Sequence, residues 1–473
     1  MLSISVKNGI ALSSEPGSTM VERFDSPDER MMRESFCLVA DQILQDQNSF
    51  QQEENWRIGF ELELPLVTED MGVADQKQRD LIVSRSVNCG KELGAHQVEL
   101  SNPQPIEHWI QSPRLIQETL EEIIHPIKQD AASMGLRFLR IGFVPFPEVN
   151  ATLATKGVYK YEHCPRWHRE NQEPSREDLA GMTRQGIWVN DPFIVSLANA
   201  THVTVDATGF TDAIDKLNRA LMISPMATAL GASGQFCMGK DTGYRDIRFT
   251  TWRISHETRD LADVSSGLSN RVGLPKDYFK NLIDYFNKVL SYPFVLAGSQ
   301  FVEHAFEISN GLFWRDARLK FFRDKKRVGV EFRPIATQPS LQEDIALAMF
   351  FLGRLMWSQA TNENLINMSY IRKNKNSAEK FGTSGKMFVQ DDHWLCRRNT
   401  VEVLGVEICR AESGLLNHGM RTQDVSGFVQ IWKNRIKNGS PSEQLAREIE
   451  RVDPSGSNKT EALRTAVREM CLE

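Results

Sequence analysis

The octapeptide Ile58-Gly59-Phe60-Glu61-Leu62-Glu63-Leu64-Pro65 alternates apolar with acidic side chains, which predicts a β-strand. Successive side chains of a strand point to opposite faces, so Glu61 and Glu63 lie on one face, roughly 7 Å apart. At an effective dielectric constant of about 20, two charges at that separation repel by roughly 2 kcal/mol. In a cleft, a bound proton or a cation must relieve this repulsion, and hard divalent ions bind carboxylate oxygens well. An edge strand with a solvated outer face is the alternative interpretation, which the octapeptide by itself does not exclude.

Three further segments repeat this pattern of one apolar and one polar face: His96–Leu100, Thr201–Asp206 and Arg327–Pro334. Their polar faces carry, in that order, Gln97 and Glu99; His202, Thr204 and Asp206; and Arg327, Glu331 and Arg333. If the four strands share a sheet, these side chains line one surface that contains both carboxylates and guanidinium groups. A metal–triphosphate site requires that mixture, because carboxylates bind the metal and arginines neutralise charge that develops during transfer. The alternative is a ladder of solvated salt bridges, and a lone strand histidine such as His202 is more often structural than a ligand.

The rest of the chain predicts an α+β protein, with mainly antiparallel strands from its middle covered by helices. Helices are expected near residues 27–50, 111–134, 211–223 and 276–290, and strands near 137–144, 200–206, 244–253 and 327–335. Residues 151–190 mix Gly, Pro, His and charged residues, which predicts a long loop near a site. From Ser340 onward the pattern is mainly helical, with a polar break at 438–442.

The composition is that of a globular protein: 473 residues, 41% apolar and 25% charged. The formal net charge of −6 provides no cationic field for nucleic acid or acidic membranes, so we expect neither as a partner. Seven cysteines, an odd number without a CxxC pair, indicate neither a zinc site nor a disulfide framework. The N-terminus lacks the features of a signal peptide, and no run approaches the ~20 apolar residues of a membrane span. These features predict a cytoplasmic protein with reduced thiols.

Three common motifs of nucleotide binding and catalysis are missing from the sequence. Residues Gly382–Met387 are too short for a P-loop and lack the Ser or Thr that follows its lysine. No GxGxxG follows a predicted strand, and no GxSxG is present. A bound nucleotide would therefore be held through metal ions and side chains, in agreement with the acidic strands.

Several other segments follow the octapeptide in a characteristic order and spacing. They are Gln97–Ser101, Leu136–Phe143, Lys156–Lys160, Ala200–Asp206, Ser224–Leu230, Gly243–Arg248 with Trp252, Asn270–Gly273, Trp314–Arg318 and Val330–Arg333. In this order they resemble the glutamate–cysteine ligase family, carboxylate–amine ligases of the glutamine synthetase superfamily. The resemblance covers roughly residues 55–385, and its colinearity is more specific than any single motif.

The resemblance implies a curved sheet around a funnel-shaped active site that takes ATP as co-substrate and Mg²⁺, or Mn²⁺, as metal. It assigns metal binding to Glu61, Glu63, Glu99 and Glu331, with His202 on a metal or a nucleotide phosphate. It places Glu331 and Arg333 in catalysis, with Arg333 facing the transferred phosphoryl group or the substrate carboxylate. Arg248 and Lys156 resemble anchors for substrate carboxylates, and Arg318 and Arg271 resemble phosphate-binding cations.

Two positions depart from the family pattern. Thr204 stands where many bacterial relatives carry a second histidine. Ser233-Gly234-Gln235-Phe236 replaces the plant-like Asn-Ser-Pro-Phe, close to where the acceptor amine is expected to be selected. The acceptor therefore stays open.

The expected activity is ATP-dependent formation of a γ-glutamyl amide through an acyl phosphate, with γ-glutamylcysteine as the best guess. A related ligase that couples glutamate or another amino acid to a non-cysteine amine in specialised metabolism is the alternative. A phosphagen kinase of related fold and a non-catalytic binding subunit are further alternatives. We expect an N-terminal helical segment at 1–54, the catalytic domain at 55–385 and a C-terminal helical region at 386–473. The partners are small molecules, and the oligomeric state is open.

Overall fold

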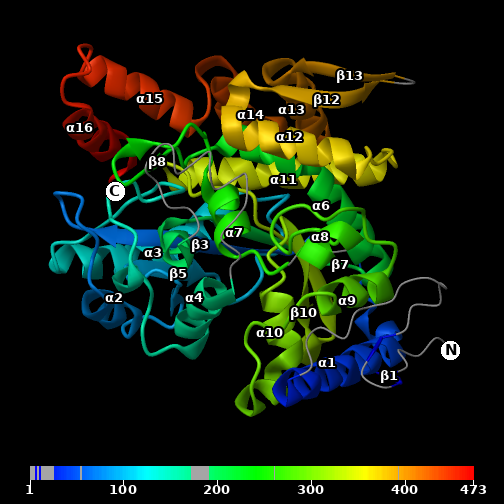
Figure 1. Cartoon of the computed structure of the whole chain (residues 1–473). Helices are drawn as coiled ribbons and strands as arrows, with labels where there is room; N and C mark the ends of the chain where they lie inside the picture. Colours follow the sequence, from blue (N-terminus) through cyan, green and yellow to red (C-terminus); the bar gives the residue numbers. More distant parts are fainter. Residues whose placement is uncertain are drawn as a thin grey trace.

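The computed structural model describes residues 6–7, 10–11, 26–53, 56–171, 191–259, 261–391 and 394–473. Residues 172–190, part of the region expected to be a loop, lie outside the described residues, as does most of the segment before Ser26. In Figure 1 a central sheet lies below one group of helices, and further helices flank it on both sides.

The central sheet confirms the predicted antiparallel architecture. Its strands are β3 (Ile58–Val67), β4 (Cys89–Lys91), β5 (Gln97–Ser101), β6 (Arg137–Phe138), β7 (Thr201–Ala207), β10 (Ala317–Phe322) and β11 (Arg327–Phe332). They pair in the order β10-β11-β7-β3-β5-β4, with β6 on β3, and every pair is antiparallel. The register sets Glu61 opposite His202, and Glu63 opposite Glu99. Because directly opposed residues share a face, the predicted polar faces lie on one side of a single sheet.

Helices cover the apolar face of this sheet. Helix α6 (Phe210–Gly231) contacts β7, β10 and β11, and α3 (Arg114–Ser133) contacts β5 and β6. Helix α11 (Leu341–Ala360) joins them, and its Phe351 ring stacks on Phe332 of β11 with centroids 3.9 Å apart. Each large apolar side chain buried there contributes roughly 1.5–3 kcal/mol, which keeps the acidic face turned away from the core.

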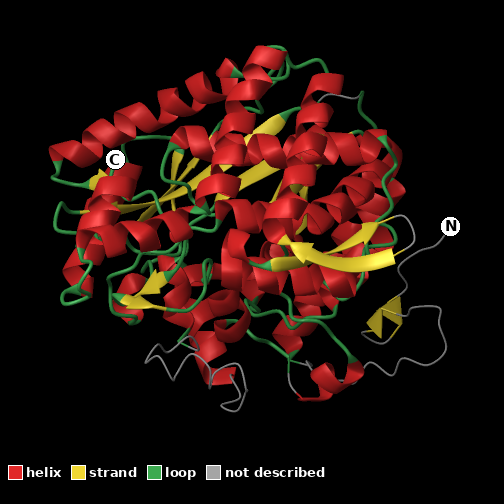
Figure 2. Cartoon of the chain, turned by 90° about the horizontal axis from the view of Figure 1, so that it is seen from above, coloured by secondary structure: helices red, strands yellow, loops and turns green. Residues whose placement is uncertain are grey.

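The C-terminal helices form a further layer, which packs on α6 and α11. They are α12 (Met368–Phe381), α13 (Thr400–Asn417), α14 (Thr422–Asn438), α15 (Pro441–Val452) and α16 (Lys459–Cys471). Figure 2 looks down on this layer and shows the helices covering the strands. Gly353 of α11 and Gly414 of α13 let the two backbones touch, because a Cβ at Gly414 would overlap the Gly353 carbonyl oxygen.

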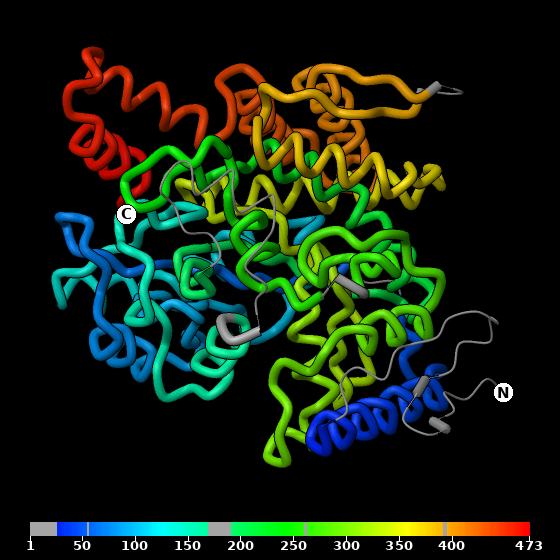
Figure 3. Tube along the Cα trace, viewed as in Figure 1, coloured from blue at the N-terminus to red at the C-terminus, as the bar shows by residue number. Residues whose placement is uncertain are grey.

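The N-terminal helix α1 (Pro27–Gln45) packs against α10 (Ala305–Gly311), a helix distant from it in sequence. Figure 3 shows these two segments side by side. The ring of Phe36 stacks on Phe306 with centroids 5.0 Å apart, and meets Phe286 edge-on at 6.0 Å. Helix α1 therefore supports the part of the sheet that begins with β10.

The remaining elements are short and mostly connect the larger ones. They are β1 (Val6–Lys7), β2 (Ile10–Ala11), α2 (Gln76–Val83), α4 (Tyr159–Asn171), β8 (Phe236–Cys237), β9 (Lys240–Asp241), α7 (Arg248–Ser255), α8 (Leu261–Ser266), α9 (Leu282–Leu290), β12 (Lys386–Asp391) and β13 (Trp394–Asn399). Among the described residues, no helix combines the length and the apolar character that crossing a membrane would need.

The structure corrects four local expectations. The strand expected near 244–253 is wrong, because α7 buries Arg248, Thr251 and Ser255 at helical spacing. The loop expected at 151–190 is wrong where α4 forms, at Tyr159–Asn171. The strand expected near 137–144 pairs regularly only at β6, and isolated bridges follow it. The hairpin β12–β13 interrupts the mainly helical C-terminal region.

Candidate active site

Two groups of three potential metal ligands lie on the polar face of the sheet. The first group, called the His202 cluster, joins β3, β7 and β11 and comprises Glu61, His202 and Glu331. The second group, called the Glu92 cluster, joins β3, β5 and the segment after β4 and comprises Glu63, Glu92 and Glu99. Within each group the ligand atoms lie within 4.8 Å of one another.

Three basic side chains neutralise the His202 cluster. Arg318 Nε lies 2.5 Å and Arg333 Nη1 2.8 Å from the same Oε2 of Glu331. Lys320 pairs with Glu61 and lies 3.2 Å from the other oxygen of Glu331. Glu331 is fully buried, so these charge-assisted bonds compensate the loss of its hydration.

The cations keep the carboxylates of this cluster ionised. Burial and the nearby Glu331 raise the pKa of Glu61, but the bond from His202 and the charge of Lys320 outweigh them and lower it to about 2. Burial also raises the pKa of Glu331, yet Arg318 and Lys320, with Arg333, hold it well below its ordinary value. Both carboxylates therefore carry their charge at any working pH.

His202 connects the two clusters. Its Nδ1 lies 3.3 Å from Glu61 Oε2, and its Nε2 lies 3.7 Å from Glu63 Oε1. Burial and the charge of Arg333 lower the pKa of His202, against the opposing pull of Glu61. A lowered pKa favours the neutral imidazole, which is the form that coordinates a metal or accepts a hydrogen bond.

The Glu92 cluster is compensated more weakly: the backbone N–H of Ala200 donates to Glu63 Oε2 at 2.7 Å, and the charges of Arg333 and Arg248 lower the pKa of Glu63 only partly. Of the residues that the structure describes, no lysine or arginine forms an ion pair with any of its three carboxylates. Burial and the charge of Glu92 raise the pKa of Glu63 to about 8 and raise that of Glu99 well above its ordinary value. Three crowded carboxylates, two of which have raised pKa values, are a donor set that fits a hard divalent cation such as Mg²⁺.

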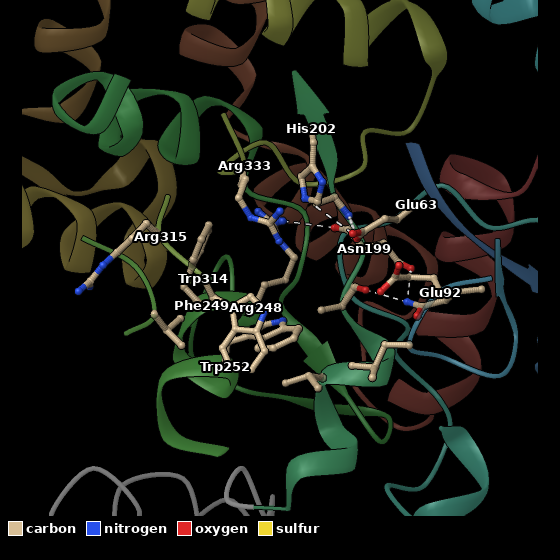
Figure 4. A pocket seen from close by; sticks show the side chains of 16 residues that line it. Glu63, Glu92, Asn199, His202, Arg248, Phe249, Trp252, Trp314, Arg315 and Arg333 are labelled. Atoms are coloured by element: carbon tan, nitrogen blue, oxygen red, sulfur yellow. Dashed lines mark hydrogen bonds and ion pairs between the residues drawn. The ribbon is translucent and has the colours of Figure 1, made fainter. Parts of the chain in front are cut away.

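A pocket opens beside the Glu92 cluster. Figure 4 shows Glu63, Glu92 and His202 on one side and the side chains of Phe249, Trp252 and Trp314 on the other. Arg333 extends from β11's end toward Glu63 and His202 (Figure 4). The pocket therefore combines acidic, cationic and aromatic walls next to the candidate metal ligands.

The family model for glutamate–cysteine ligase family 2 (GCS2) matches residues 57–469. The chain belongs to this family. Among curated proteins, the chain is 24% identical over 280 residues to the chloroplastic glutamate–cysteine ligase A of Oryza sativa subsp. indica. It shows the same identity to the chloroplastic glutamate–cysteine ligase B of Oryza sativa subsp. japonica. Each match covers 56% of this chain and 51% of the relative, so the match spans about half the length of these relatives.

Solved structures share the fold at low sequence identity. A glutamate–cysteine ligase from Francisella tularensis in complex with AMP superposes with a TM-score of 0.54 and 12% identity, over 89% of this chain and 90% of that chain. A bifunctional glutathione synthetase from Pasteurella multocida gives a TM-score of 0.52 and 12% identity, over 92% of this chain and 54% of that chain. These matches establish for this GCS2 chain the curled antiparallel sheet covered by helices.

Most site residues expected from the GCS2 resemblance converge. Glu61, His202 and Glu331 form one cluster, and Glu63 and Glu99 belong to the other. Arg318 and Arg333 both lie on Glu331, as ion pairs.

The structure does not bring every expected site residue to the clusters. The three exceptions are Arg248, Arg271 and Lys156. Arg248 lines the pocket, but its guanidinium is held by Asp246 and by backbone carbonyls, including that of Pro334 at 2.8 Å. Arg271 is buried behind the pocket wall and donates to the carbonyl of Pro293 at 2.7 Å. Lys156 is exposed in the turn before α4 and is not among the residues that line the pocket.

Two residues of this GCS2 site, Lys320 and Glu92, are not among those expected from the sequence. Lys320 stands two residues after Arg318 on β10, so alternation along that strand gives it the same polar face. That signal was available, but the strand segment expected from the resemblance ended at Arg318, whereas β10 continues to Phe322. Glu92 follows the three-residue strand β4 and carries no pattern of its own, so only the folded chain brings it to Glu63 and Glu99.

Proposed function

We propose that this chain is an ATP- and Mg²⁺-dependent carboxylate–amine ligase that forms a γ-glutamyl amide. The observation that carries the proposal is the pair of carboxylate clusters on one face of the sheet, bordered by Arg318, Lys320 and Arg333. Membership of the GCS2 family supports the same reaction class.

In the proposed reaction, an oxygen of the substrate carboxylate attacks the terminal phosphorus of ATP, which forms an acyl phosphate and releases ADP. The amine then attacks the acyl carbon, loses a proton and displaces phosphate. Phosphorylation is needed because it converts an oxygen of the carboxylate into a good leaving group. The task of the protein is to position the reactants and to stabilise charge.

Arg333 is the residue best placed to stabilise the transferred phosphoryl group. It belongs to the pocket lining and also pairs with Glu331, so its guanidinium spans from the ionised cluster to the substrate space. Glu331 holds Arg333 and Arg318 in fixed positions before any substrate binds. Such preorganised charge costs no reorganisation during the reaction.

Glu61, His202 and Glu331 would hold one divalent ion, and Glu63, Glu92 and Glu99 would hold another. A bound Mg²⁺ supplies charge neutralisation for the phosphate oxygens. Arg248 has a supporting role in this proposal, because Asp246 and the carbonyls already occupy its donors. We propose that Arg248 holds the backbone at Pro334, just after β11, in place and does not bind the substrate carboxylate.

The pocket leaves a second candidate acceptor class. Phe249, Trp252 and Trp314 give the substrate space an aromatic wall, which favours an amine larger or more apolar than cysteine. Cysteine therefore remains the first candidate by family membership, and a bulkier amine in specialised metabolism is the second.

We propose residues 55–385 as the catalytic unit, since both clusters and every pocket residue fall within them. Residues 1–54 and 386–473 would be supporting segments. Helix α13 of the latter packs tightly on α11, and the family match continues to residue 469, so we expect this support to be essential for folding.

The test is a product assay with the full chain, ATP, Mg²⁺, glutamate and a panel of amines. ADP release and a product mass equal to glutamate plus amine minus water support the ligase. Cysteine as the best amine selects γ-glutamylcysteine, whereas a better aromatic amine selects the second candidate. A stable phosphorylated amine without amide would identify a kinase, and no Mg²⁺-dependent ATP binding would remove the enzymatic proposal.

A further inference from the structure

A third group of potential ligands lies apart from both carboxylate clusters and has a different chemistry. Cys164 and His168 come from α4, and His256 directly follows α7. Their ligand atoms lie within 4.8 Å of one another. Their exposed fractions are 5%, 0% and 1% respectively, so the group is closed from solvent.

Helix geometry brings the first two ligands together. Cys164 and His168 are four residues apart on α4, and residues at that spacing lie on one face of a helix. Helix α7 then delivers His256, whose ring centroid lies 4.2 Å from that of His168. The thiol and both imidazoles therefore meet where α4 faces the end of α7.

The histidines have unused coordination capacity. Neither ring nitrogen of His168 makes a hydrogen bond of normal geometry, although the residue is fully buried. His256 uses Nδ1 with the hydroxyl of Ser255 at 2.8 Å, which leaves Nε2 for a ligand. A buried polar nitrogen without a partner costs free energy, and a metal ion would remove that cost.

The protonation states suit a transition metal. Burial lowers the pKa of His256 to about 3 and, together with His256 and Arg271, lowers that of His168 well below its ordinary value, against a small opposing effect of the Glu257 backbone. Both imidazoles are therefore neutral, as metal ligands must be. Burial raises the pKa of the Cys164 thiol to about 12, and Arg271 opposes this. A bound metal would displace the thiol proton.

We propose that Cys164, His168 and His256 form a binding site for a borderline-soft divalent transition ion of the zinc type. One thiolate and two imidazoles are the ligands that Zn²⁺ selects, whereas Mg²⁺ requires oxygen ligands. The ligand atoms must draw together slightly to coordinate one ion, and the nearby guanidinium of Arg271 opposes added positive charge. We therefore expect weaker binding than in a four-ligand structural zinc site.

The site would connect α4 to the wall of the substrate pocket. The ring of His256 lies 4.6 Å from Trp252 and 5.1 Å from Trp314, measured between centroids. Both tryptophans line the pocket, so a metal bound behind them would stiffen its aromatic wall. The proposed role is structural and does not depend on the ligase proposal.

Cobalt(II) provides the decisive probe, because a cobalt–thiolate bond gives a charge-transfer band that oxygen and nitrogen ligands do not. We would titrate tag-free, full-length protein with Co²⁺ in excess Mg²⁺, which occupies the carboxylate clusters. A charge-transfer band that saturates at one equivalent and is bleached by Zn²⁺ is expected. A wild-type protein without this band would overturn the proposal without recourse to any variant.

Variants then locate the site. C164S should abolish the band, and H168Q, which removes a ligand, should weaken Co²⁺ binding by at least the roughly 100-fold that loss of an outer-shell partner can cost. C237S is the matched control, because Cys237 is also buried with a pKa raised to about 12 by burial, and it should keep the full band. A band that survives in C164S, or disappears in C237S, would place the metal elsewhere.

A melting experiment separates misfolding from loss of the site. Zn²⁺ should raise the melting temperature of the wild type and of C237S by a few degrees in excess Mg²⁺. C164S and H256Q should retain a cooperative transition that Zn²⁺ does not move. An equal zinc-dependent shift in all four proteins would contradict the proposal.

Discussion

The His202 cluster and the Glu92 cluster share one sheet face and similar carboxylates, yet their charges are balanced in opposite ways. The chain itself supplies Arg318, Lys320 and Arg333 to the first cluster, and its carboxylates have lowered pKa values. It supplies no paired cation to the second among the described residues, and the pKa values of Glu63 and Glu99 are raised. The comparison shows that a carboxylate cluster is defined by its neighbours as much as by its own residues. We infer that the first cluster, besides holding its proposed ion, organises the arginines, and that the second depends on its divalent ion for charge balance.

Removing the shared acceptor of the first cluster should have the largest effect. In E331Q, Arg318, Lys320 and Arg333 lose the charge that holds them, so kcat for ADP release should fall by about 10³-fold. E307Q is the control, since Glu307 lies in an exposed ion pair with Arg323. A fall of less than tenfold in E331Q would show that this cluster is not needed to organise the arginines.

The two clusters should also change the free energy of unfolding in different pH ranges and in opposite directions. Glu63 has its pKa raised from 4.5 to about 8, so the folded protein holds this proton more tightly than the unfolded chain. In EDTA, this contribution to stability is present below pH 4.5 and is lost as the pH rises to 8, by on the order of a few kcal/mol. Glu61, whose pKa is lowered to about 2, acts in the opposite sense and loses its contribution only below pH 4.5.

Urea unfolding at a series of pH values, with EDTA or with Mg²⁺, measures both losses of stability: the one between pH 4.5 and 8, and the one below pH 4.5, called the acid limb. Mg²⁺ should remove the loss between pH 4.5 and 8 and leave the acid limb in place. Equal pH profiles with and without Mg²⁺ would contradict this prediction.

Neutralising the central carboxylate of the second cluster should weaken its metal binding. E92Q removes one proposed ligand and also the charge that raises the pKa values of Glu63 and Glu99. We expect Mg²⁺ affinity, measured through Mg²⁺-dependent ATP binding by calorimetry, to fall 10- to 100-fold, or about 1.4–2.7 kcal/mol. E118Q, on the exposed side of α3, should bind as the wild type does. Unchanged Mg²⁺ dependence in E92Q would remove the second cluster as a metal site.

Removing one cation from the first cluster should make it resemble the second. K320M leaves Glu61 without its ion pair, so the pKa of Glu61 should rise and its affinity for a divalent ion should increase by about tenfold. The Mg²⁺ concentration needed for half-maximal activity measures this change. K326M, which breaks an exposed pair with Asp46, should leave that concentration unchanged.

Local geometry explains why the sheet could be predicted. Alternation along Ile58–Val67 and Thr201–Ala207 is a property of each strand alone, and burying the apolar side dictates where the acids point. A strand was expected where α7 forms because polar and apolar residues alternate there with neither a clear strand period nor a clear helix period. In the fold, α7 buries Arg248, Thr251 and Ser255, which lie on one face of a helix. The odd number and scattered positions of the cysteines suggested no zinc site, because the proposed ligands Cys164, in α4, and His256, directly after α7, are brought together only by the fold.

By itself the sequence determined the fold class, the acidic and basic strand faces and the family resemblance, because these depend on the spacing of neighbouring residues. Only the tertiary structure decided which carboxylates receive a cation. Lys320 reaches Glu61 across 259 positions of the chain, and Glu92 joins Glu63 and Glu99 from a segment without a pattern. Such pairings follow from strand order and register, and charges interact through space irrespective of their separation along the chain.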